Sequence, residues 1–158
     1  MAAKKYSTEA MAVAVQEAYA GINAKDGGPF GAVIVKSDTG EIVGRGHNRV
    51  LMKKDPTCHG EMEAIRDACK NLGTYDLSGC DIYTTGEPCP MCLGAIMWAN
   101  IDNICYGCNK KDTDKIGFRD DKFYERIAEG NIGKEHEEFR KLSMQVYKQY
   151  KQMNPTIY

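Results

Sequence analysis

The chain has 158 residues, 42% of them apolar, and a formal net charge of −1. This length suffices for one domain with a substantial core, and the absence of a long run of one charge sign argues against a broad electrostatic surface for nucleic acid. No apolar run is long enough to cross a membrane or to act as a secretory signal, which indicates a cytoplasmic protein without a membrane span. Seven cysteines in such a chain indicate thiols or metal ligands rather than a disulfide framework.

The first part of the chain alternates between helical and strand patterns. Apolar residues recur at helical spacing over residues 11–22, behind Ser7 or Thr8 as a helix cap. An apolar, β-branched run at residues 32–35 and a second run that begins at residue 42 are separated by a turn, which predicts a hairpin. Glycines in the second arm indicate a bulge or a close approach of the backbone to another element.

The middle of the chain continues this alternation. After a polar loop, a helix is predicted from about residue 59 to a point near Gly73. Residues 81–85 form a predicted strand, and the helix that starts near Pro90 is apolar nearly all round, so we expect it to be buried. A fourth strand is predicted at residues 101–107. Strands that alternate with helices pair in parallel, so together with the hairpin they predict a mixed sheet.

Beyond residue 109 the patterns are weaker. Residues 110–118 are interpreted as a polar loop and residues 121–128 as a helix. Residues 135–152 fit a longer helix, but the stretch 142–147 also fits a short strand, and the sequence leaves both alternatives open. No internal repeat divides the chain, so we expect a single domain over residues 1–158.

Two short stretches contain the residues suited to chemistry. The first is His59-Gly60-Glu61, and the second is Pro88-Cys89-Pro90-Met91-Cys92. The imidazole of His59 and the thiolates of Cys89 and Cys92 are ligands that zinc favours. Three protein ligands leave the fourth position of a catalytic zinc open for water. The pattern H-x-E followed by P-C-x-x-C is the signature of zinc nucleobase deaminases.

Glu61 is interpreted as a proton carrier that stays off the metal. Zinc lowers the pKa of its bound water to about 7, so hydroxide is available at neutral pH. Glu61 would take a proton from that water and deliver it to a ring nitrogen and then to the leaving amine. The predicted reaction is therefore hydrolytic deamination, with ammonia as a product.

Two competing interpretations remain for the cysteines and the metal. Cys105 and Cys108 form a second C-x-x-C, which together with the first would imitate a four-thiolate structural site, although strand alternation places these two residues on opposite faces. A non-catalytic zinc-binding scaffold is the other interpretation, and Glu61 argues against it because a structural site has no use for a carboxylate there. His47 and His136 are interpreted as surface or locally hydrogen-bonded residues rather than ligands.

At these residues the sequence resembles the cytidine and deoxycytidylate deaminase superfamily, and more closely the bacterial guanine deaminases of that fold. The resemblance covers roughly residues 8–126 and the last residue. Beyond the metal motif it rests on residues 28–35, Asn48, 55–57, 87–95, 98–99, Asp112, Gly117-Phe118 and Tyr158. The sequence departs from these relatives at Cys58 and Gly60, which flank His59 and where they more often have alanine, and over residues 131–153, which match poorly.

The resemblance implies a fold and an assembly. The fold is an α/β, three-layer α-β-α sandwich of the cytidine deaminase type around a mixed sheet of about five strands. The assembly is a homodimer in which the C-terminal segment, residues 119–158, is exchanged between subunits. Tyr158 then closes over the site of the partner.

The resemblance also implies the substrate and the residues that bind it. Guanine would lie over one zinc ion per chain and be hydrolysed at C2 to xanthine and ammonia. Asn48 would hydrogen-bond the base, and Asp112 would assist proton transfer or hold the leaving amino group. Phe30 and Trp98 would wall the pocket, although both rings fit a place in the core nearly as well. The implied substrate-binding residues are Asn48, Phe30, Gly60, Trp98 and Tyr158.

Guanine deamination is the leading functional hypothesis, motivated by Asp112, Gly117-Phe118 and Tyr158 together. Deamination of cytosine, or of another free base or nucleoside including guanosine, is the alternative. Editing of adenosine in tRNA requires phosphate contacts, and the nearly balanced charges from Arg119 onwards give that hypothesis little support.

Overall fold

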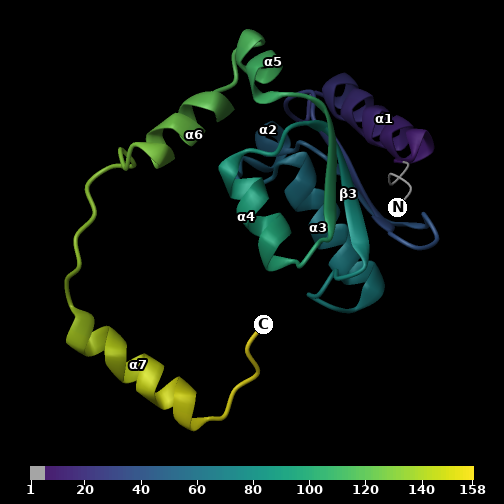
Figure 1. Cartoon of the computed structure of the whole chain (residues 1–158). Helices are drawn as coiled ribbons and strands as arrows, with labels where there is room; N and C mark the ends of the chain where they lie inside the picture. Colours follow the sequence, from purple (N-terminus) through teal and green to yellow (C-terminus); the bar gives the residue numbers. More distant parts are fainter. Residues whose placement is uncertain (1–5) are drawn as a thin grey trace, which may run out of the picture.

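The computed structural model describes residues 6–158 and shows a mixed α/β arrangement (Figure 1). The sheet consists of β1 (Gly31–Lys36), β2 (Ile42–His47), β3 (Cys80–Gly86) and β4 (Asn103–Cys108), in the spatial order β2-β1-β3-β4. β1 pairs antiparallel with β2 and β3, whereas β3 pairs in parallel with β4. The hairpin and the mixed sheet predicted from the sequence are confirmed.

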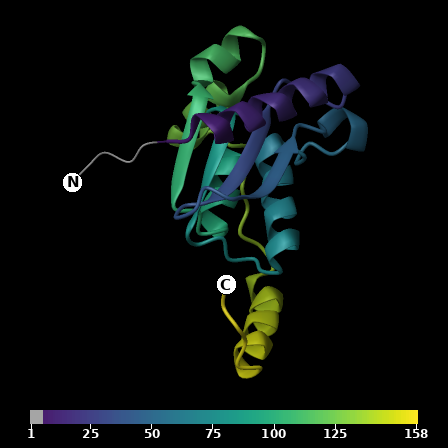
Figure 2. The same ribbon diagram turned by 90° about the vertical axis from the view of Figure 1, so that its right-hand side faces the viewer.

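Helices cover both faces of this sheet (Figures 1 and 2). α1 (Thr8–Ala24) lies on one face, and α3 (Gly60–Leu72) and α4 (Pro90–Trp98) lie on the other. Because side chains alternate along a strand, β1 directs Val33 and Val35 towards α1, and Ala32 and Ile34 towards α3. Each face of the sheet therefore has its own apolar core, and the three-layer α-β-α sandwich is confirmed.

The close packing of α3 against β2 depends on two glycines. A Cβ atom at Gly44 would lie 2.6 Å from the carbonyl oxygen of Ala64, and one at Gly46 would lie 2.7 Å from the amide nitrogen of Ala64. Side chains at these two positions would push α3 away from the sheet. The close approach expected from the glycines of the second strand is confirmed, and it fixes the start of α3.

The boundaries of the main helices follow their sequence signals. Ser7 caps α1 by accepting a hydrogen bond from the backbone N–H of Ala10 at 3.1 Å. α3 ends at Gly73, which adopts a left-handed φ of 66°. α4 begins with Pro90, whose missing N–H is not needed in a first turn. Across residues 6–158, no helix combines the length and the apolar character that crossing a bilayer requires.

Two expectations for local structure are wrong, and one short helix was not predicted. Residues 110–118 are not all loop, because α5 (Lys110–Lys115) begins there with a reciprocal capping box between Asn109 and Asp112. α4 is not buried all round, since Met97 and Trp98 are 70% and 69% exposed within one chain. The unpredicted helix is α2 (Val50–Lys53), which lies between β2 and α3.

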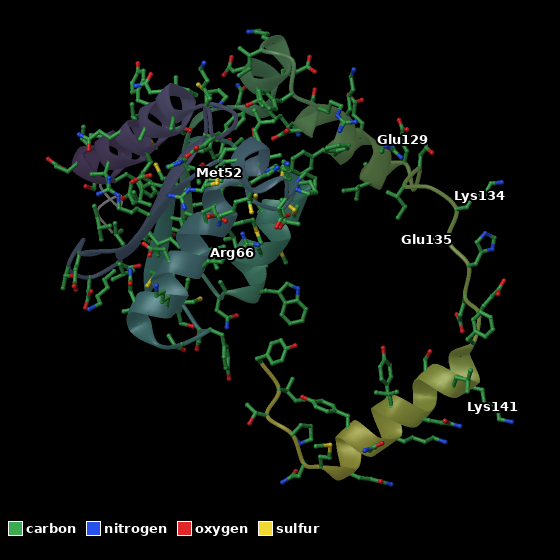
Figure 3. The ribbon with its side chains drawn as sticks, turned by 180° about the vertical axis from the view of Figure 1, so that it is seen from behind. Met52, Arg66, Glu129, Lys134, Glu135 and Lys141 are labelled. Carbon is green, nitrogen blue, oxygen red and sulfur yellow. The ribbon has the colours of Figure 1, made fainter. Side chains whose placement is uncertain are left out.

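The C-terminal segment leaves the body of the molecule. After α6 (Asp120–Ala128), an extended stretch leads to α7 (Arg140–Gln152), which stands clear of the sheet in both ribbon views (Figures 1 and 2). No residue of α7 is buried. Figure 3 shows Glu129 and Lys141 along this segment, well apart from Arg66 on the body.

The structure decides between the two alternatives for residues 142–147. They lie within α7, so the strand interpretation is wrong, and the sheet of the described residues has four strands instead of about five. A strand here would need a neighbouring strand to pair its backbone groups, whereas a helix satisfies its own. The chain end then returns to α4, where the ring of Tyr158 lies 6.0 Å from that of Trp98.

Candidate active site

A cavity of about 470 Å³ opens near the start of α3, beside α2 and the start of α6. His59, Glu61 and Cys89 lie together in its lining. Phe30 and Phe118 form another part of the wall, with their ring centroids 4.9 Å apart in edge-to-face contact. The volume is in the range of pockets that enclose small organic ligands.

The predicted metal ligands meet where two helices begin. His59 and Cys89 are the N-cap residues of α3 and α4, and neither side chain makes a capping hydrogen bond. Their side chains are therefore free to project ahead of the helices, whose N-terminal ends both face this point. Cys92 follows one turn into α4, and the ligand atoms of the three residues lie within 4.8 Å of one another.

The donor set and its spacing fit a zinc ion. Zn–S bonds of about 2.3 Å and Zn–N bonds of about 2.0–2.1 Å at a tetrahedral angle place the nitrogen and sulfur atoms about 3.6 Å apart. The distance from His59 Nδ1 to Cys89 Sγ is 3.6 Å. Three ligands leave one tetrahedral position open, as a catalytic zinc requires.

The protonation of the two cysteines also indicates a site for a cation. Hydrogen bonds from the Cys92 thiol and from His59 lower the pKa of Cys89 to about 4, although burial opposes this shift. The proton shared with Cys89, together with burial and the charge of Glu61, raises the pKa of Cys92. Without a cation, only one of the two sulfurs carries a charge, whereas a divalent metal ion stabilises both thiolates.

Glu61 is buried in the first turn of α3, next to the metal group but not part of it. Its Oε2 atom lies 3.2 Å from Cys92 Sγ. Burial raises the pKa of Glu61 above its usual range. A carboxyl group with a raised pKa at this place is suited to accept a proton and to return it.

Asn48 is buried directly after β2 and lines the cavity. Its Oδ1 atom accepts a hydrogen bond from the backbone N–H of Val50 at 3.1 Å, and its own backbone N–H donates to the carbonyl of Phe30 at 2.9 Å. Because a backbone N–H can only donate, Oδ1 is the side-chain atom that faces Val50. The Nδ2 amide of Asn48 is then the group available to donate to a ligand.

A carboxylate that the sequence did not single out, Asp120, lies in the cavity where Asp112 was expected. Asp112 accepts a hydrogen bond from the backbone N–H of Asn109 at 3.1 Å and faces a separate hollow. Asp120, at the start of α6, lines the cavity beside Arg119, and burial and the charge of Cys89 raise its pKa. The sequence places an acidic residue at the start of this helix, but only the packing of α6 shows which acid reaches the metal group.

Trp98 and Tyr158 do not line the cavity of their own chain. Their rings are in contact at the other end of α4, where both residues line a different hollow. Gly60 packs against the cavity wall, since a Cβ atom there would lie 3.0 Å from the carbonyl oxygen of Phe30. Among the predicted substrate-binding residues, the structure brings Asn48 and Phe30 into the cavity.

The loop that holds Cys89 is fixed by hydrogen bonds to α5 and α6. The Glu87 carboxylate accepts a hydrogen bond from the backbone N–H of Lys110 at 2.9 Å, and the Tyr124 hydroxyl donates to the carbonyl of Pro88 at 2.6 Å. Burial and the charge of Glu87 raise the pKa of Tyr124 to about 12, so this hydroxyl remains a donor at neutral pH. These two bonds tie α5 and α6 to the metal loop.

The second C-x-x-C does not contribute to the metal group. Cys105 packs against the core on the α1 side, and Cys108 is exposed. Within residues 6–158, the group of three suitable side chains is His59, Cys89 and Cys92. The four-thiolate alternative is therefore wrong.

Comparisons with known proteins agree with this geometry. Residues 4–108 match the family model of the cytidine and deoxycytidylate deaminase zinc-binding region. The chain is 51% identical over 114 residues to a guanine deaminase of Bacillus subtilis, and the match covers 72% of each protein. It is 46% identical over 83 residues to a tRNA-specific adenosine deaminase of Aquifex aeolicus, a match that covers 52% of this chain and 54% of that protein.

Solved structures show the same relationship. The crystal structure of the B. subtilis guanine deaminase has a TM-score of 0.89 and 39% identity, over 98% of this chain and 99% of that chain. A guanine deaminase from Nitrosomonas europaea has a TM-score of 0.67 and 32% identity, over 72% of this chain and 65% of that chain. The B. subtilis match thus extends along nearly the whole chain, including its C-terminal segment.

Proposed function

The chain belongs to the cytidine and deoxycytidylate deaminase family, and on this basis we propose that it is a zinc-dependent guanine deaminase. The reaction replaces the C2 amino group of guanine by oxygen from water, which gives xanthine and ammonia. The observation that carries the proposal is the similarity to the B. subtilis guanine deaminase over 98% of the chain. The sequence matches give the same ranking, since the B. subtilis guanine deaminase match covers 72% of the chain and the A. aeolicus tRNA-specific deaminase match covers 52%.

In this proposal His59, Cys89 and Cys92 hold one zinc ion per chain. When bound, zinc supplies a water molecule whose pKa is lowered to about 7, which makes it a nucleophile at neutral pH. The two convergent helix starts add partial positive charge that stabilises the thiolates and the attacking oxygen. None of the seven cysteines, all of which the structure describes, is in a disulfide, which fits the reducing conditions of the cytoplasm.

Glu61 moves the protons of the reaction. Its carboxylate takes one proton from the attacking water and gives it to the ring nitrogen next to C2. It then takes the second proton of that water and gives it to the amino group, which leaves as ammonia. The burial that raises the pKa of Glu61 supports both directions of transfer.

Asn48, Asp120 and the two phenylalanines orient the base. The Nδ2 amide of Asn48 donates to an acceptor on the purine, and the carboxylate of Asp120 accepts from its amino group. Phe30 and Phe118 provide an apolar wall that keeps bulk water from one side of the ring. Asp120 takes the role expected of Asp112, because Asp112 is committed to the start of α5.

The active form in this proposal is a homodimer in which the chain beyond α6 is exchanged. α6 itself stays on its own chain, because the Tyr124 hydroxyl binds the carbonyl of Pro88 there. On α7, the apolar residues Leu142, Val146 and Tyr150 recur at helical spacing and are all exposed. On α4, Met97 and Trp98 are also exposed. Two uncovered apolar surfaces on one chain are both buried when two copies exchange their C-terminal segments. Tyr158 would then reach the cavity of the other copy.

Parallel assays separate guanine from the alternatives. The zinc-loaded full-length protein is incubated with guanine, guanosine, cytosine and adenine, and both ammonia and the deaminated product are measured. We expect xanthine and an equal amount of ammonia from guanine. Turnover of cytosine or guanosine without turnover of guanine would overturn the substrate while leaving the reaction type. Salt-sensitive binding and deamination of tRNA would instead favour an editing enzyme.

A further inference from the structure

His47 is the last residue of β2 and directly precedes Asn48. Although only 7% of it is exposed, its ring lies between two carboxylates from different parts of the chain. Nδ1 lies 2.8 Å from Oε2 of Glu17 on α1, and Nε2 lies 2.8 Å from Oδ2 of Asp26 in the loop after α1. A single imidazole therefore connects the end of β2 to α1 and to the loop that follows α1.

The number of protons on this ring follows from its two partners. A carboxylate can only accept a hydrogen bond, whereas a neutral imidazole has one N–H and one acceptor nitrogen. Both 2.8 Å contacts to carboxylates are hydrogen bonds only when both ring nitrogens donate, which is the imidazolium form of the ring. Burial alone would raise the pKa of Glu17, but hydrogen bonds from His47 and Arg45 outweigh it and lower that pKa, so Glu17 remains a carboxylate.

Two arginines complete the charges that face the ring. Arg45 pairs with Oε1 of the Glu17 carboxylate, whereas His47 contacts Oε2. The Arg49 Nε–H group also points at His47 Nε2, at 3.4 Å, and that nitrogen would have to accept this bond. The contact of Nε2 with Asp26 is shorter, at 2.8 Å, so Asp26 is the main partner of that nitrogen. The cluster thus holds two carboxylates, two guanidinium groups and one imidazolium.

The same cluster supports the wall of the cavity. The backbone carbonyl of Asp26 accepts hydrogen bonds from the N–H groups of Leu51 and Met52, each at 3.0 Å. The loop also packs directly on Asn48, because a Cβ atom at Gly27 would lie 2.0 Å from Asn48 Oδ1. Gly27, Asn48 and Leu51 all line the cavity. A displacement of Asp26 would therefore move three parts of the pocket wall together.

We propose that His47 is a positioning residue for the base: its imidazolium form fastens α1 and the loop at Asp26 to the strand end that carries Asn48. The bridge is complete while both ring nitrogens donate, one to each carboxylate. Loss of this bridge weakens substrate binding and leaves the chemical step unchanged, because His47 contacts neither the metal group nor Glu61. This proposal rests on the proposed deaminase function.

Three variants test the bridge: His47→Gln, Asp26→Asn and the double variant. KM and kcat are measured separately for each. In His47→Gln, the new amide has one donor end and one acceptor end. Its oxygen must therefore face one of the two carboxylates, and the hydrogen bond to that carboxylate is lost. We expect KM for guanine to rise about tenfold, the effect of losing one charge-assisted hydrogen bond. We expect kcat and zinc content to stay near those of the wild type.

Asp26→Asn distinguishes an orienting role from a merely structural one. A neutral imidazole can donate from Nδ1 to Glu17 and accept at Nε2 from the new amide, so the bridge persists without a buried charge. We therefore expect a nearly normal KM. Adding Asp26→Asn to His47→Gln should restore most of the lost KM, because the two amides are complementary.

His136→Gln is the matched control, since His136 is exposed in the stretch before α7 and should leave all constants unchanged. A normal KM in His47→Gln, or no restoration in the double variant, would overturn the proposal. The ring state is measured separately by ¹⁵N NMR of His47, where a neutral ring at pH 7 would also overturn it. Because this spectrum needs no substrate, a failure of guanine turnover in the wild type would be recognised as a failure of the proposed function alone.

Discussion

Two regions of the chain differ in how completely their apolar side chains are buried. They are the body, residues 6–128, and the C-terminal segment beyond α6, residues 129–158. Between β1 and β4, apolar side chains pack on both faces of the sheet. Throughout residues 6–158, every buried side-chain nitrogen and oxygen has a hydrogen-bond partner. Beyond α6, apolar side chains such as Val146 and Tyr147 are exposed. One chain thus brings the candidate metal ligands and Glu61 together, whereas its C-terminal segment has an uncovered apolar face, which in our proposal a second copy covers.

The largest effect should come from removing the proton carrier of the body. Glu61→Gln keeps the size of the side chain but cannot accept a proton, so we expect kcat to fall by about 10²–10⁴-fold. Zinc content, by elemental analysis, and the melting temperature should remain close to those of the wild type.

The matched control lies two residues further along the same helix. Glu63 is engaged by Lys53 and Arg66, each at 2.7 Å, and does not line the cavity. Glu63→Gln should therefore lower stability while leaving kcat near normal. Equal turnover in Glu61→Gln and the wild type would show that another group carries the protons.

The next effect concerns the two aspartates near the junction of body and C-terminal segment. Asp120→Asn should lower kcat/KM by about 10–100-fold, since it removes one charged hydrogen bond to the base. Asp112→Asn should leave kcat/KM near normal and reduce the unfolding free energy by about 1 kcal/mol, because it weakens the capping box of α5. The reverse ranking in steady-state kinetics would return the catalytic role to Asp112.

A charge on the apolar face of α7 tests whether the C-terminal segment depends on a second copy. Val146→Asp would bury an unpaired carboxylate in the exchanged interface, so we expect the dimer to weaken by at least about tenfold. Light scattering after size exclusion measures this change, and zinc content reports on the body. Lys148→Asp, which is on the same helix but not an apolar position, should keep the dimer. A wild-type protein that is monomeric at high concentration would contradict the exchange.

The smallest effect is on the pH dependence of stability in the body. Burial would raise the pKa of Glu63, but hydrogen bonds from Lys53 and Arg66 outweigh it and lower that pKa below 4.5. A lowered folded-state pKa stabilises the protein above the unfolded value, and this contribution is lost as pH falls below it. Denaturant titrations should show unfolding free energy decreasing below about pH 4.5, with a smaller decrease in Glu63→Gln. Identical slopes for both proteins would assign the pH dependence to other groups.

The metal group could be predicted from the sequence because its geometry is local. His59 and Cys89 are the residues that precede two helices, and Cys92 lies one turn beyond the second start. Their spacing therefore fixes most of their arrangement once the two helices lie on one face of the sheet. Glu61 follows for the same reason, since it occupies the first turn of α3.

The choice between Asp112 and Asp120 could not be made from the sequence, because it depends on tertiary packing. The capping box turns Asp112 back onto the backbone of α5, and the bond from Tyr124 to Pro88 brings α6 and Asp120 against the metal loop. Residues 142–147 were ambiguous for a related reason. Their apolar pattern indicates a buried face but not whether a strand or a second chain will cover it.

The most direct test of the central claim follows the oxygen of water into the product. The protein is purified without chelators, its metal content is measured, and guanine is converted in ¹⁸O-labelled water with mass spectrometry of the base. We expect one zinc per chain and xanthine with a single labelled oxygen at C2, together with an equal amount of ammonia. Protein that contains no metal, or zinc-loaded protein that forms no labelled xanthine, would contradict the claim that His59, Cys89, Cys92 and Glu61 form a hydrolytic guanine deaminase site.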